Sequence, residues 1–128
     1  MNTSHTPATI AAPIGPFCHG VEVSRGSRMI YTTGEAGVRP DGEAPPTIEE
    51  QAEWCWRNIE AVLTHAGFEM KDLVKITTFL THPDQVAAAG KVRAKHLGDI
   101  RPASTTVIVS HLVRPEWLIE IEAVAAQS

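Results

Sequence analysis

The segment from Trp117 to Ala125 constrains the fold most, because its side chains alternate between two faces as they do in a strand. One face is apolar throughout and consists of Ile119, Ile121 and Ala123. The other face mixes apolar with acidic side chains: Leu118, Glu120, Glu122 and Val124. A strand of this kind belongs to a sheet whose apolar face must be covered, and helices are the usual cover.

The mixed face has two interpretations: it is a solvated sheet face, or it is covered by another subunit. Leu118 and Val124, joined on the neighbouring strand by Thr106 or Ile108, make this face less polar than solvent requires. This composition favours cover by a second copy of the chain.

A helical cover is predicted from about Ile48 to Ala66, where apolar residues recur at helical spacing. Thr47 and Glu50 have the spacing of a capping box at its start. Gly67 suits the position just after its end, and Phe68 is placed to close a Schellman-type contact. The sequence therefore predicts a long helix with one apolar stripe.

The remaining elements follow from alternation and from turn residues. A second helix is expected from Pro83 to about Leu97, ending at Gly98. Further strands are expected at Arg28–Thr33, Leu73–Leu80 and Thr105–Val109. The order strand, helix, strand, helix, strand, strand predicts one α+β domain over residues 1–128, an open sheet with two helices packed on one face.

Composition excludes several classes of function. The net charge is −4 and no basic stripe occurs, so no nucleic-acid partner is expected. Cys18 and Cys55 are too few for a disulfide framework, and the histidines form no metal motif. No phosphate-binding or dinucleotide-binding loop is present, so no cofactor is expected. Trp54 and Trp56 fit packing or rim roles better than a stacking platform.

The chain also lacks the marks of export or membrane insertion. Residues 1–10 have neither a positive segment nor an apolar run of signal-peptide length. No stretch approaches the roughly 20 apolar residues that span a bilayer. The expected location is the cytoplasm, with no membrane partner.

Four segments together carry a family resemblance: Ala11–Phe17, Ile30–Gly34, Arg101–Val107 and Ile119–Ala125. In this order and at these separations, they resemble the Rid family of enamine/imine deaminases, also called the YjgF type. The resemblance implies a fold similar to trimeric chorismate mutase, with three sheets around a central barrel-like core. It implies a homotrimer with a pocket between each pair of subunits, and a small imine, enamine or other metabolite as ligand.

The resemblance also implies site residues. Its catalytic acidic residue matches Glu120, and its substrate-binding positions match Phe17, Thr33, Gly34, Gly90, Ser104 and Thr106. Three positions depart from the pattern. Ser104 replaces an arginine that clamps the substrate carboxylate, Phe17 replaces a tyrosine, and Gly90 replaces an asparagine. The water-handling part is thus retained and the carboxylate clamp is not.

This set suits imine hydrolysis, because a carboxylate can position the water that attacks a C=N carbon. Hydroxyls such as those of Thr33 and Thr106 can hold a polar end of the substrate. Each role has a plainer alternative: Glu120 is a surface carboxylate, or Ser104 is an ordinary strand hydroxyl.

Without the arginine, simple 2-imino acids are expected to be poor substrates, and Ser104→Arg to restore part of their turnover. If another residue supplies the positive charge, the candidates are Arg93, Arg101 and Arg114.

Two functions remain open at this point. The first is hydrolytic deamination of an imine or enamine. The second is a non-catalytic trimer of the same fold that binds or senses a small molecule. A third function attached to such proteins, RNA cleavage, fits poorly with an acidic chain that lacks a basic groove.

Overall fold

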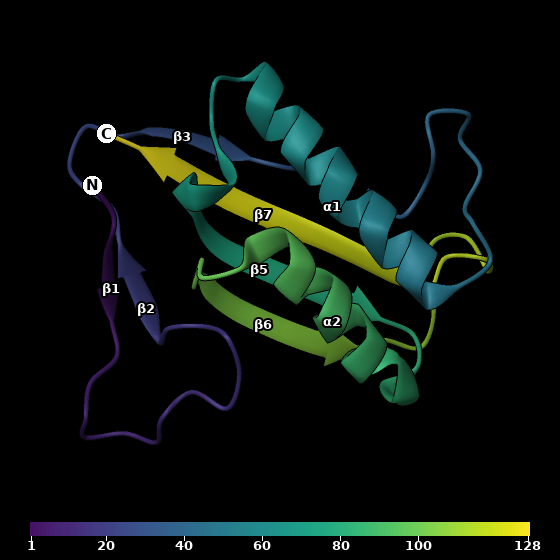
Figure 1. The fold of residues 1–128 in the computed structure, drawn as a ribbon, viewed down its shortest axis with the longest axis horizontal. Helices are drawn as coiled ribbons and strands as arrows, with labels where there is room; N and C mark the ends of the chain where they lie inside the picture. Colours follow the sequence, from purple (N-terminus) through teal and green to yellow (C-terminus); the bar gives the residue numbers. More distant parts are fainter.

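The computed structural model describes residues 1–128 and contains two helices over a mixed sheet (Figure 1). The helices are α1 (Ile48–His65) and α2 (Val86–Leu97), with 3₁₀ turns η1 (Met70–Asp72) and η2 (Pro83–Gln85). The strands are β1 (Thr3–His5), β2 (Gly20–Glu22), β3 (Arg28–Tyr31), β4 (Glu35–Ala36), β5 (Leu73–Leu80), β6 (Ala103–Ile108) and β7 (Ile119–Gln127). No helix is long and apolar enough to cross a membrane.

The main sheet has the order β3-β7-β5-β6, and β4 also pairs with β7. All of its pairings are antiparallel except that of β5 with β6, which are parallel and are connected through α2. Both helices lie on the same side of the sheet in Figure 1. The predicted α+β arrangement, two helices on one face of a sheet, is therefore present.

Local signals place α1 as predicted. The backbone N of Glu50 donates to Thr47 Oγ1 at 3.2 Å, which is the N-cap half of the expected box. At the other end Gly67 has φ +83°, and Phe68 N donates to Leu63 O at 2.8 Å, as in a Schellman motif. The apolar stripe of α1 is buried against the sheet: Ile48, Ala52, Cys55, Trp56, Ile59 and Leu63.

The strands were predicted unevenly. β5 has the expected bounds, whereas β3 ends at Tyr31 and β7 begins at Ile119 and continues to Gln127. The β1–β2 hairpin and the short β4 were not expected. Both are stabilised by pairing between distant segments, and each is too short to show an alternating pattern of its own.

The predicted alternation of β7 is confirmed, because Ile119, Ile121 and Ala123 are buried beneath the helices. The prediction that Thr106 or Ile108 of β6 lies on the mixed face was wrong. Thr106 is opposite Thr78 and Ile108 is opposite buried Leu80, so both belong to the helix-facing side.

The sheet face away from the helices, called the open face below, keeps its mixed character with different residues. Val107 and Glu120 are both opposite Phe79, and Tyr31 is opposite Val124. Tyr31 is 70% exposed and Val107 is 38% exposed. An acidic side chain and several apolar ones therefore share a face that nothing in this chain covers.

Candidate functional site

The main cavity of the molecule has a volume of about 790 Å³ and lies between α2, the sheet and the loop that precedes β2. Its floor is formed by helix-facing strand residues: Thr78, Leu80, Ile119 and Ile121. Trp56 of α1 closes one side, with 1% of its surface exposed, which confirms a packing role for this aromatic residue. A cavity of this size and apolar lining suits a small organic ligand.

Four of the predicted site residues meet in this cavity: Phe17, Gly90, Ser104 and Thr106. Phe17 comes from the loop before β2, Gly90 from α2, and the two hydroxyl residues from β6. An added Cβ on Gly90 would meet nothing within 4 Å, so the space next to it is open.

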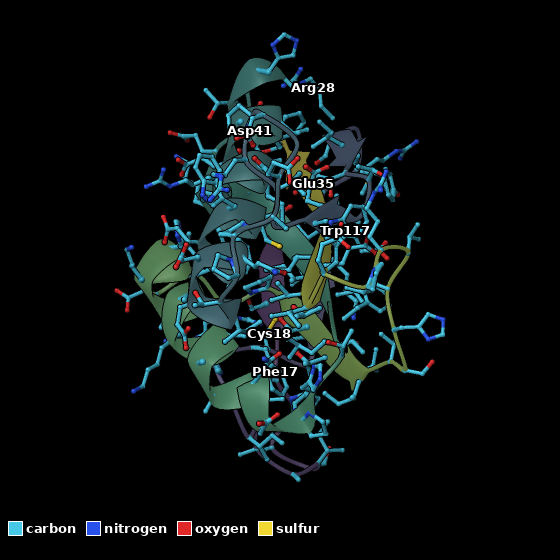
Figure 2. The ribbon with its side chains drawn as sticks, turned by 90° about the vertical axis from the view of Figure 1, so that its right-hand side faces the viewer. Phe17, Cys18, Arg28, Glu35, Asp41 and Trp117 are labelled. Carbon is cyan, nitrogen blue, oxygen red and sulfur yellow. The ribbon has the colours of Figure 1, made fainter.

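The other three predicted residues, Thr33, Gly34 and Glu120, do not line this cavity. Thr33 and Gly34 form the link between β3 and β4, and Glu120 lies on β7. Because Ile119 and Ile121 face the cavity, strand alternation directs Glu120 to the open face. Figure 2 shows the separation, with Phe17 in the lower half of the view and Glu35, next to Gly34, in the upper half.

Gly34 and Glu120 form a tight pair. An idealised Cβ on Gly34 would lie 2.8 Å from Cδ of Glu120 and 2.9 Å from its Oε2. Only a residue without a side chain fits at this position while the Glu120 carboxylate keeps its place. The absence of a side chain at Gly34 therefore leaves the space that the Glu120 carboxylate occupies.

A second carboxylate stands at the same corner. Burial, and the charge of Glu120 close by, raise the pKa of Glu35 above its usual range. The Cys55 thiol donates to the backbone O of Glu35 at 3.2 Å, and burial raises its pKa, with the two carboxylates adding to the effect. The corner is therefore acidic and partly desolvated, and its cysteine is an inert buried thiol.

The cavity has the opposite charge. Arg93 of α2 donates from Nη2 to Ser104 Oγ at 2.8 Å and to the backbone O of Pro16 at 3.0 Å. Its Nε is buried without a partner, and the guanidinium makes no ion pair. Burial, together with the charge of Arg101, lowers the pKa of Arg93. Lys91 also lines the cavity, and no Asp or Glu does.

The other two arginines considered from the sequence are engaged elsewhere. Arg101 donates to the backbone O of Gly98 at 2.6 Å and to that of Ile100. Arg114 lies 5.9 Å from the centre of the Trp117 ring. Neither lines the cavity, so Arg93 is the guanidinium that the fold brings there.

The position of α2, and so of Arg93, depends on contacts with α1. Glu53 of α1 accepts from Lys95 Nζ and from His96 Nε2 of α2, each at 2.9 Å. It also accepts from Arg57 Nε at 2.9 Å. These hydrogen bonds outweigh the cost of burial and lower the pKa of Glu53 to about 2. His96 in turn stacks on Trp56, which links the ion-pair cluster to the cavity wall.

Sequence reasoning gave Arg93 only as one of three candidates and missed Glu35. Arg93 carries a usable signal, because it lies three residues after Gly90 and therefore close to it on one helix face. Glu35 has a weaker signal, since it directly follows Thr33 and Gly34 but belongs to a strand too short to predict.

Comparison with known proteins gives consistent results over almost the whole chain. The family model described as endoribonuclease L-PSP matches residues 8–127. A RutC family protein of Pyrococcus abyssi is 34% identical over 115 residues, covering 88% of this chain and 87% of its own. The Escherichia coli protein named "Putative reactive intermediate deaminase TdcF" is 32% identical over 119 residues, covering 90% and 89%.

Solved structures agree. The Rid-family protein YyfB of Yersinia pestis superposes with a TM-score of 0.87 at 27% identity and covers 98% of both chains. Escherichia coli TdcF with bound serine superposes with a TM-score of 0.75 at 32% identity and covers 91% of both chains.

Proposed function

Because the chain belongs to the endoribonuclease L-PSP (YjgF/Rid) family, we propose that it hydrolyses a small imine or enamine in a pocket shared by two copies of the chain. The cavity residues Phe17, Gly90, Ser104 and Thr106 come from one copy. Glu120, with Thr33 and Gly34, comes from a neighbour and positions the attacking water. The relative TdcF is named as a putative reactive intermediate deaminase, and its solved structure holds serine, so a small nitrogen-bearing ligand is in keeping with the family.

The observation that carries this proposal is the division of the site between two faces of one sheet. Ser104 and Thr106 face the helices, whereas Glu120 faces away from them. The two groups cannot converge within a single chain, because the sheet lies between them. A second copy that packs its edge strand β6, where its cavity lies, against the open face would bring that cavity up to Glu120.

The same face has the composition of a subunit interface. Tyr31, Phe79, Val107 and Val124 give it an apolar character, and a monomer would leave them to solvent. We propose a homotrimer with a chorismate-mutase-like central core formed by three open faces. Sedimentation at micromolar concentration is expected to give a trimer, and a stable monomer would remove the shared pocket.

The proposed chemistry is a balanced hydrolysis. Water adds to the carbon of the C=N bond while the nitrogen takes up a proton, and the resulting carbinolamine collapses to a carbonyl compound and ammonia. Glu120 accepts a proton from the attacking water, which typically contributes about 10²–10⁴-fold to the rate. Thr106 lies in the cavity wall, where its hydroxyl can hold a polar group of the substrate.

The direct test compares two carboxylates of β7. Glu120→Gln should reduce ammonia release from oxidase-generated imines by about 100-fold or more, without changing the assembly state. Glu122→Gln is the matched control, because Glu122 is two residues away on the same face and is exposed. Equal rates for wild type and Glu120→Gln on an accepted substrate would contradict the role of Glu120.

A mixing experiment tests whether the site is shared. Glu120→Gln removes the carboxylate, and Gly90→Trp fills the open space of the cavity, so each variant alone should be inactive. Random mixed trimers would regain about a quarter of wild-type activity, because half of the subunits offer an intact cavity and half an intact carboxylate. No recovery in mixed trimers would mean that both groups must come from one copy.

A non-catalytic binding trimer is the alternative. Its distinguishing result is tight binding of a metabolite in the cavity with no ammonia release from a broad set of imines. The RNA-cleaving activity in the family model's description has no such support here, because the net charge is −4 and the cavity is mostly apolar.

A further inference from the structure

Arg93 lies beside the position at which the family resemblance implies an arginine and this chain has Ser104. The strand residue at the clamp position is Ser104, whose hydroxyl has no charge to offer an anion. The structure places a guanidinium against that hydroxyl from α2, with 2.8 Å between Arg93 Nη2 and Ser104 Oγ. The charge and the strand position are therefore together in space although they are eleven residues apart in sequence.

The guanidinium is anchored but electrically unbalanced. Both hydrogens of Nη2 are used, by Ser104 and by the backbone O of Pro16. Nη1 makes no hydrogen bond within the chain, Nε is buried without an acceptor, and no carboxylate is near enough for an ion pair. A half-buried cation of this kind is costly unless an anion approaches it.

The surrounding cavity supports an anionic ligand with an apolar body. It contains two cationic residues, Lys91 and Arg93, and no acidic residue. Ten of its nineteen lining residues are hydrophobic, which leaves few polar groups besides the hydroxyls of β6 to orient a ligand. In such an apolar environment, an attraction between opposite charges is stronger than it is in water.

We propose that Arg93 is the residue that recognises the anionic group of the ligand, and that the substrate class is an apolar imine or enamine bearing a carboxylate. The identity of the substrate as an imine or enamine rests on the proposed function. The recognition of an anionic group by Arg93 rests on the cavity alone. Ser104 and the Pro16 carbonyl hold the guanidinium, and Nη1 donates to the carboxylate. Simple 2-imino acids, which are expected to be poor substrates when Ser104 is considered alone, then become acceptable substrates.

The test is a binding measurement that needs no turnover. 2-Oxopentanoate has a ketone in place of the C=N bond, a short apolar chain and a carboxylate, and 2-oxopentanamide is its neutral counterpart. Calorimetry on the wild-type assembly should show the carboxylate binding at least about tenfold more tightly than the amide, as expected of a charge-assisted hydrogen bond. Equal binding of the two compounds, or binding of neither, would overturn the proposal.

Variants then assign the effect. Arg93→Met should abolish the preference for the carboxylate, whereas Arg25→Met should keep it. Both remove one positive charge, but Arg25 is exposed and lies outside the cavity. The double variant Arg93→Met with Ser104→Arg moves the guanidinium from helix to strand and should restore part of the preference. If Arg93→Met still binds the carboxylate more tightly than the amide, Arg93 does not bind the anionic group.

Two safeguards separate the possible failures. If Arg93→Met does not assemble, Arg93→Lys keeps the charge but loses the anchoring pair, and a preference reduced by about tenfold is expected. If imines without a carboxylate are hydrolysed as fast as those with one, and Arg93→Met leaves both rates unchanged, the anion proposal fails while the deaminase proposal stands. If no imine is hydrolysed but the protein still binds the carboxylate more tightly than the amide, the deaminase proposal fails while the anion proposal stands.

Discussion

The two faces of the sheet differ in charge, in cover and in how their side chains are held. On the helix side, Arg93 lies in a cavity with no carboxylate, and α2 forms one wall. On the open face, Glu120 lies against Gly34 with the partly buried Glu35 close by, and neither carboxylate makes an ion pair within the chain. Each face is unbalanced alone, and the two imbalances have opposite signs.

In the shared site proposed above, one chain supplies the recognition half of one pocket and the water-activating half of another. A recognition half needs an apolar wall and a positive charge, and a water-activating half needs a carboxylate held in place. Placing both on one face would let Arg93 and Glu120 neutralise each other in a salt bridge. In the proposed assembly, separation by the sheet keeps each group free until a second copy brings the halves together.

The largest expected effect comes from disturbing the carboxylate half. Gly34→Ala would place a Cβ 2.8 Å from Cδ of Glu120, so the carboxylate must move by a few tenths of an ångström or more. A displaced catalytic group is expected to lower kcat by about 100-fold. Steady-state ammonia release measures this, with carboxylate binding in the cavity as the internal control. An unchanged kcat would mean that the Gly34–Glu120 contact does not position the reacting group.

The recognition half gives a smaller effect of unexpected sign. Taken from the sequence alone, Ser104→Arg would improve turnover of 2-imino acids. Arg93 is already hydrogen-bonded to Ser104. An arginine at position 104 would place a second positive charge beside Arg93 and would remove the hydroxyl that anchors it. The single variant is therefore expected to lower kcat/KM for these substrates by about tenfold, and addition of Arg93→Met to reverse the loss. A higher kcat/KM for 2-imino acids in Ser104→Arg alone would show that Arg93 does not bind the substrate carboxylate.

The two halves also predict opposite pH dependence of stability. The pKa of Glu53 is lowered to about 2, so its contribution is present above its usual value of 4.5 and is lost as pH falls towards 2. Wild type should exceed Glu53→Gln by about 1 kcal/mol in free energy of unfolding at neutral pH, and the two should converge near pH 2. The pKa of Glu35 is raised, so its charged form is disfavoured by folding. The free energy of unfolding of Glu35→Gln should therefore increase relative to that of the wild type as pH rises through that pKa.

Urea unfolding at a series of pH values measures both differences. Parallel curves for wild type and Glu53→Gln from neutral pH down to pH 2 would show that the ion pairs between α1 and α2 contribute nothing.

Local signals made part of the fold predictable. The bounds of α1 follow from Thr47 and Gly67, whose capping contacts involve only the adjacent turns. β5 follows from the strict alternation of its side chains. The β1–β2 hairpin and β4 depend on pairing with distant segments, and nothing within their own few residues shows it. Local pattern therefore predicts long elements and misses short ones.

Four of the seven residues predicted for the site line one cavity, but their arrangement could not be predicted from the sequence. These four residues are Phe17, Gly90, Ser104 and Thr106. The run Thr105-Thr106-Val107-Ile108 has no polar alternation, so its register and facing could not be read from it. The rotation of α2 was equally hidden, because the small residues Ala87 to Gly90 give no apolar stripe to orient Arg93.

The smallest effect concerns Gly90, and it tests the statement that the cavity half has room. Gly90 lies inside α2, and a Cβ there would meet nothing within 4 Å. Gly90→Ala should therefore stabilise the protein by about 0.5–1 kcal/mol, because glycine is a poor residue for a helix interior. Gly98 is the matched control at the end of the same helix, where φ is +54° and an alanine is strained, so Gly98→Ala should destabilise. Thermal unfolding of the two variants measures both signs. A destabilised Gly90→Ala would mean that the space beside Gly90 is filled in the assembled protein, and the neighbouring copy would then reach deeper into the cavity than the position of Glu120 requires.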